Sequence, residues 1–200
     1  MRPLLAGLLG VSLDLVADPP VVYMDFWVWK HGGAWFGVPW SNYVGWFLLL
    51  ALYIYLMELA LRHVAPRVQG VLGAILVAFL PVVPAFYIFQ VLINGYQWVV
   101  AQGYVADQVV VAVLFGVSAV VLAPFIYRAR RDHPPVKIVL FVPAFAYVTS
   151  ILGLYTSGLY LAHPQLVVVT PVVSMVSALI FCWPYLDRLL PPSPRDGKPK

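Results

Sequence analysis

The sequence is poor in charge. Of its 200 residues, 12 are Lys or Arg and 8 are Asp or Glu, so 10% are charged, whereas a soluble domain carries about a quarter. The mean hydropathy is +0.89, and 62% of the residues are hydrophobic. These values exclude an ordinary soluble domain. They predict a polytopic membrane protein that forms one unit rather than two domains.

Cysteine and metal-ligand patterns are also scarce. The one cysteine, Cys182, stands in an apolar run, which excludes a disulfide framework and a cysteine metal site. No histidine has another metal-type ligand at helical spacing, and neither a P-loop nor a GxGxxG pattern is present. We therefore expect no metal and no cofactor. The basic residues form short clusters between apolar runs, so we expect no nucleic-acid partner.

What the sequence has is apolar runs of about 20 residues, the length at which a helix crosses a bilayer. Five runs qualify: Tyr43–Leu61, Val71–Ile93, Val109–Tyr127, Ile138–Leu161 and Leu166–Tyr185. A sixth, Leu4–Ala17, is short, and Asp14 within it argues against a signal peptide. The predicted fold class is all-α, an integral membrane helical bundle of about six transmembrane helices over residues 1–190.

Basic residues predict the orientation of these helices. Lys and Arg follow the second, fourth and sixth runs, whereas the connections 94–108 and 162–165 contain neither. Because cytoplasmic loops are enriched in Lys and Arg, both termini of this multi-pass cell-membrane protein are predicted to be cytoplasmic. Residues 191–200 are rich in Pro and charge, and they are predicted to form a disordered cytoplasmic tail.

Two carboxylates mark the first run. Asp14 and Asp18 are four residues apart, so a helix places both on one face, and Gly7 and Gly10 continue that face. The Pro-Pro pair that follows Asp18 is expected to end the helix. An ionisable residue inside a span is costly and points to function, although Asp18 could simply be solvated at the interface. Two adjacent carboxylates hold their protons unequally, which supplies a general acid beside a base.

The second run opens on turn-formers. Gly37 and Pro39 predict a turn, Gly45 follows, and Ser41 or Asn42 is expected to cap the helix. The Asn42 amide could also orient a carboxylate or a water molecule, because it lies at the depth of the two Asp residues.

Six aromatic residues of this region are candidates for binding an apolar substrate or a cation: Trp27, Trp29, Phe36, Trp40, Tyr43 and Trp46. Any single tryptophan among them could instead belong to an interfacial aromatic belt. Weaker polar candidates near the outer ends of the third and fourth runs either complete the pocket or face headgroups: Gln90, Asn94, Gln97 and Asp107. Glu58 and Arg62 have the spacing of a local helical ion pair.

The strings LDLVADP and FWVWKHGGAWFGVPWSNYVGWF resemble the carotenoid biosynthesis membrane proteins, which include the CruF-type carotenoid hydratases (bisanhydrobacterioruberin hydratase-like). The matching elements are an Asp-x-x-x-Asp-Pro element and a Gly-Val-Pro-x-x-Asn-x-x-Gly-Trp signature that begins at Gly37, and they cover about the first third of the chain. Members of that family usually carry further spans before the Asp element, so the resemblance implies a shortened or rearranged relative.

The resemblance implies a hydratase that adds water to the terminal double bond of an acyclic carotenoid through a carbocation. Asp14 and Asp18 would supply the acid and the base, Asn42 would hold the water, and the aromatic residues would stabilise the cation. The implied partners are the carotenoid or another long isoprenoid, the lipid bilayer and other membrane enzymes of the pathway.

Two other functions remain open. A non-catalytic carotenoid- or lipid-binding protein, or a small transporter, fits the prolines and small residues in the spans. A membrane prenyltransferase could use the Asp pair to bind Mg²⁺ and a diphosphate, but such enzymes need a second acidic motif and basic residues, and Lys30 is the only cation nearby.

Overall fold

The computed structural model describes residues 2–128 and 137–182, and within these ranges the chain is helical with no strand. The elements in chain order are α1 (Arg2–Tyr23), α2 (Trp40–His63), the 3₁₀ turn η1 (Ala65–Arg67), α3 (Gly70–Phe79), α4 (Val82–Ala101), α5 (Asp107–Arg128), α6 (Lys137–Thr156), α7 (Leu159–Ala162) and α8 (Leu166–Cys182). The predicted tail at 191–200 lies outside the described residues.

Hydropathy and length together identify the membrane spans. Within the described ranges, four helical segments are long and apolar enough to cross a membrane: Arg2–Tyr23, Trp40–Arg67, Gly70–Ala101 and Asp107–Pro124. The apolar stretches Ala144–Thr156 and Leu166–Ile180 are shorter. The predicted class, a helical membrane bundle, is therefore confirmed, and the orientation of the helices stays a prediction.

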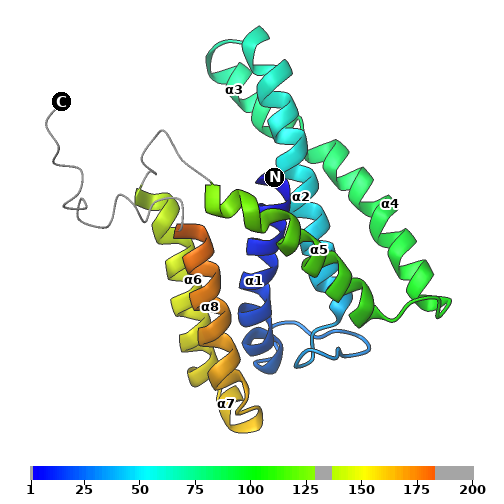
Figure 1. Cartoon of the computed structure of the whole chain (residues 1–200), viewed down its shortest axis with the longest axis vertical. Helices are drawn as coiled ribbons and strands as arrows, with labels where there is room; N and C mark the ends of the chain where they lie inside the picture. The colour runs from blue at the N-terminus through cyan, green and yellow to red at the C-terminus, as the bar shows by residue number, and fades with distance from the viewer. Residues whose placement is uncertain (1, 129–136, 183–200) are drawn as a thin grey trace, which may run out of the picture.

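Helix α1 occupies the middle of the bundle, where it packs against α2, α5, α6 and α8 (Figure 1). Its 22 residues correspond to about 33 Å of helix, enough to span a bilayer. The prediction of a short first run was therefore wrong, because the helix continues through Pro19 and Pro20 to Tyr23.

A side chain from the following loop compensates for the first of these prolines. In an α-helix, the N–H of residue 19 would bond the carbonyl of residue 15, and proline has no N–H to give. The indole Nε1–H of Trp35 donates to the carbonyl oxygen of Leu15 instead, at 3.1 Å. The prediction that the Pro-Pro pair ends the helix failed because the replacement donor lies in another segment of the chain.

Helices α1 and α2 form an antiparallel pair. At one end Arg2 Nη1 lies 3.7 Å from Glu58 Oε1, so Glu58 pairs with α1 and the predicted local pair with Arg62 was wrong. Towards the middle, Gly10 faces Leu50 and Gly7 faces Phe47, where added methyl groups would collide with the α2 side chains. The face that carries Gly7 and Gly10 therefore packs against α2.

Candidate functional site

The two carboxylates of α1 face α2 at the end of the helix pair opposite Arg2. Asp18 is buried, with 6% of its surface exposed. Its Oδ2 accepts a hydrogen bond of 2.6 Å from Asn42 Nδ2. Asp14 lies one turn deeper, and its Oδ2 is buried without a hydrogen-bond partner among the described residues. The pair thus combines one carboxylate held by an amide with one that has a free acceptor atom.

The Asn42 side chain orients Asp18 rather than capping α2. The helix begins at Trp40 with extended Pro39 at the cap position, and no side chain of the described chain bonds that terminus. The prediction that Ser41 or Asn42 caps the helix was therefore wrong. The Asn42 amide instead meets a carboxylate, a stronger acceptor than a neutral group would be.

Tyr43 follows Asn42 and turns into the interior. Its side chain is fully buried, and its hydroxyl has no hydrogen-bond partner among the described groups. Sequence reasoning placed Tyr43 in an aromatic wall for substrate, whereas its side chain lies in the buried core with Val11, Val38 and Phe47.

A cleft of about 330 Å³ opens beside Asn42, between α2, α4 and the loop before α2. Its lining is Trp29, Ser41, Asn42, Gly45, Trp46, Leu49, Phe89, Ile93 and Gln97. Ser41, Asn42 and Gln97 are polar, and the rest of the wall is apolar or aromatic. This composition is typical of a site for an apolar ligand with a few orienting polar groups.

The six predicted aromatic residues do not all reach this cleft. Trp29 and Trp46 line it. Trp40 lies between Trp35 and Tyr43, with ring centroids 5.5 and 5.7 Å away. Phe36 packs against His163 beyond α7, at 5.0 Å. Trp27 is about half-exposed in the loop, as a residue of an interfacial belt would be.

Sequence reasoning missed the α4 wall of the cleft, although a signal for it exists. Phe89, Ile93 and Gln97 are each four residues apart, so they form one stripe on α4. Gln97, named above as a weaker candidate, does complete the pocket. A methyl group added at Gly45 would lie 3.8 Å from the Phe89 ring, an ordinary packing distance, so the approach of α4 does not require glycine at this position.

The turn before α2 has the predicted glycine chemistry. Gly37 has φ of +89°, a left-handed conformation that favours glycine. Trp35 and Val38 exchange backbone hydrogen bonds across this turn, at 3.1 and 2.9 Å. At Gly33 an added methyl group would overlap the backbone of Val38 and Pro39. The turn therefore places the Trp35 indole against the Leu15 carbonyl and positions Asn42 beside Asp18.

Five buried side-chain polar atoms have no hydrogen-bond partner among the described residues. Within the described chain they are Asp14 Oδ2, Trp29 Nε1, Trp40 Nε1 and Tyr43 Oη, together with Ser174 Oγ on α8. Most buried polar atoms in proteins are paired, so each of these atoms is a candidate for contact with a water molecule or a ligand.

Comparison with known proteins gives one match. The family model described as carotenoid biosynthesis protein matches residues 1–119, which is more than half of the chain and includes both carboxylates and every residue of the cleft. No curated protein and no solved structure matches the chain significantly.

Proposed function

Since the chain belongs to the carotenoid biosynthesis protein family, we propose that it is a membrane hydratase. In this proposal it adds water to the terminal double bond of an acyclic carotenoid. The family supplies the pathway, and the proposal concerns the reaction and the residues that perform it.

One observation carries the proposal: Asn42 lines the aromatic cleft and at the same time donates to Asp18. It therefore links the space where an apolar end group can lie to a pair of intramembrane carboxylates. Asp14 Oδ2 and the Tyr43 hydroxyl are also buried without hydrogen-bond partners among the described residues. Hydration of an alkene needs an acid, a held water molecule and a dry apolar wall. In this proposal the Asp pair is the acid, Asn42 holds the water and the cleft is the wall.

The reaction balances without an oxidant, a reductant or a further co-reactant. The protonated member of the Asp pair gives its proton to the inner, hydrogen-bearing carbon of the double bond, and a tertiary carbocation remains on the outer carbon, which bears two methyl groups. The oxygen of a water molecule bonds to that carbon, and a proton of this water passes to a carboxylate of the pair. The product gains one hydrogen and one hydroxyl, and the pair regains its proton.

The carbocation needs stabilisation that leaves it reactive towards water. Trp29, Trp46 and Phe89 line the cleft, and an aromatic face stabilises a cation within about 6 Å of the ring. Asn42 and Gln97 are the polar groups of the lining best suited to hold the attacking water, because each amide both donates and accepts.

The test is expression in a host that accumulates an acyclic carotenoid and has no hydratase. Pigments are extracted and compared by liquid chromatography and mass spectrometry, with Asp14→Asn and Asp18→Asn beside the wild type. Asp25→Asn is the matched control, because it makes the same chemical change in the exposed loop after α1.

We expect a pigment heavier by one water from the wild type and from Asp25→Asn, and little of it from the two site variants at equal membrane levels. Unchanged pigment that co-purifies with a well-expressed wild type would overturn hydration and identify a binding protein. Substrate flux in vesicles without a change of mass would identify a transporter.

A further inference from the structure

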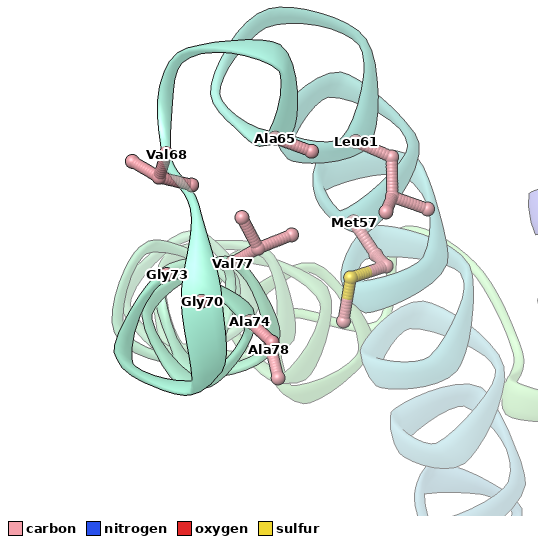
Figure 2. Close-up of a pocket in the computed structure, with 9 residues that line it drawn as sticks. All are labelled: Met57, Leu61, Ala65, Val68, Gly70, Gly73, Ala74, Val77 and Ala78. Atoms are coloured by element: carbon pink, nitrogen blue, oxygen red, sulfur yellow. The ribbon is translucent and has the colours of Figure 1, made fainter.

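A second apolar pocket lies at the other end of α2 (Figure 2). Its volume is about 390 Å³. It is formed by the last turns of α2, the η1 turn and α3, and its lining is Met57, Leu61, Ala65, Val68, Gly70, Gly73, Ala74, Val77 and Ala78. The lining contains no ionisable side chain, so this pocket suits a purely apolar group.

Both pockets lie along the same face of α2. Trp46 and Leu49 line the cleft beside Asn42, and Met57 and Leu61 line the second pocket. Tyr53 falls between them, and all five residues are three or four positions apart, which places them on one helical stripe. The opposing wall is α4 at the cleft and α3 at the second pocket. The two pockets therefore lie at opposite ends of one stripe of α2 that faces the α3–α4 segment, and the surface between them along this stripe is called the crease.

The length of this crease matches a membrane-spanning ligand. Asn42 and Leu61 are 19 residues apart on α2, which corresponds to about 28 Å of helix. The hydrocarbon core of a bilayer is roughly 30 Å thick. A rigid, extended polyene with one end at Asn42 reaches the second pocket with its other end.

The shape of the second pocket fits a flat end group. On the α3 side the wall consists mainly of Gly70, Gly73, Ala74 and Ala78, none of which has a side chain larger than a methyl group (Figure 2). On the α2 side, Met57 is flexible and polarisable, and such side chains adapt to apolar ligands. Between the pockets the exposed Tyr53 hydroxyl lies 3.4 Å from the Ala78 carbonyl oxygen, so a chain that reaches both pockets passes over the Tyr53 side chain.

We propose that the second pocket binds the far end of the same long-chain isoprenoid whose near end lies beside Asn42. The crease then selects substrates by length, since a chain that stops short of α3 gains nothing from this pocket. The inference rests on the proposed function for the identity of the ligand. It adds a binding site that is separate from the carboxylates.

The test fills the second pocket and compares two ligands. Ala74→Trp places an indole in the pocket, and Leu72→Trp makes the same addition on the exposed side of α3, where Leu72 is 82% exposed. The full-length variants are expressed in cells that accumulate either a full-length acyclic carotenoid or a half-length polyene with the same end group. Pigment bound per purified protein is measured separately from the hydrated product. Ala78→Leu is a smaller filling change, for use if Ala74→Trp lowers the amount of folded protein.

We expect Ala74→Trp to bind about tenfold less of the full-length carotenoid, as the loss of a few buried carbon groups dictates. Ala74→Trp should bind as much of the half-length polyene as the wild type does. Leu72→Trp should bind as much of either ligand as the wild type does. Equal binding of both ligands by Ala74→Trp and wild type overturns the inference and leaves a membrane lipid as the occupant of the pocket, without affecting hydration at the carboxylates. If the expected binding pattern is found but no hydrated pigment forms, the result supports ligand binding in the second pocket and overturns the proposed hydration.

Discussion

The indole nitrogen of Trp35 lies 3.1 Å from the carbonyl oxygen of Leu15, the acceptor that Pro19 leaves without its helical donor. This bond lets α1 continue past two prolines while Asp18 stays on the face towards α2. The loop before α2 therefore stabilises the helix that carries the carboxylates.

Trp35→Phe tests this bond because it removes the N–H and keeps an aromatic ring. We expect a loss of about 1–3 kcal/mol in stability, the cost of an unsatisfied buried carbonyl, and a drop in product formation. Trp40→Phe is the matched control, since its indole nitrogen is buried without a partner among the described residues. Thermal melting in detergent and pigment analysis measure both effects. Equal melting temperatures for the two variants would contradict the role of the Trp35 bond.

Asn42→Ala tests the amide that holds Asp18. The substitution leaves a buried carboxylate without its 2.6 Å donor, so we expect at least a tenfold fall in hydrated pigment. Ser41→Ala is the control, because Ser41 lines the same cleft and bonds no described group through its side chain. Pigment mass and retention measure the outcome. Similar losses of hydrated pigment in the two variants would show that product formation depends on the cleft lining rather than on the bond to Asp18.

Tyr43→Phe separates activity from stability. Removal of a buried hydroxyl that has no partner in the described chain relieves a desolvation cost, so we expect an unchanged or raised melting temperature. If the hydroxyl serves the carboxylates, product formation nevertheless falls. Parallel melting and pigment measurements test this split, and full activity in a stable Tyr43→Phe protein would remove the hydroxyl from the mechanism.

Gly7→Ala and Gly10→Ala test the approach of α1 to α2. At Gly7 the added methyl group would lie 3.0 Å from the Phe47 carbonyl oxygen and 2.9 Å from its ring, and the backbone cannot move aside cheaply. At Gly10 it would meet the end of the flexible Leu50 side chain, which can rotate. We expect Gly7→Ala to lower the melting temperature by several degrees more than Gly10→Ala. The opposite order would contradict the packing described here.

The sequence was sufficient to predict the helical membrane class, because long apolar runs admit few other structures. It also predicted the Asp face of α1, the Gly37 turn and the possibility that Asn42 orients a carboxylate. These features depend on local spacing and local backbone conformation.

The wrong predictions concern residues whose interaction partner comes from a distant part of the chain. Proline ends many helices, but here the loop brings the Trp35 N–H back to α1, where it bonds the Leu15 carbonyl that Pro19 leaves without a donor. Glu58 has Arg62 at helical spacing, yet Arg2 pairs with it across the helix interface. Spacing along one helix cannot show which of two cations is nearer in space.

The central position of α1 has a consequence for how the protein is made. A newly synthesised α1 would bring Asp14 and Asp18 to the membrane before Asn42 has left the ribosome, and lone carboxylates partition poorly into lipid. The antiparallel contacts with α2 supply the missing amide and close packing at Gly7 and Gly10. We therefore expect these two helices to enter the bilayer together as a hairpin, with α6 and α8 joining a preformed pair.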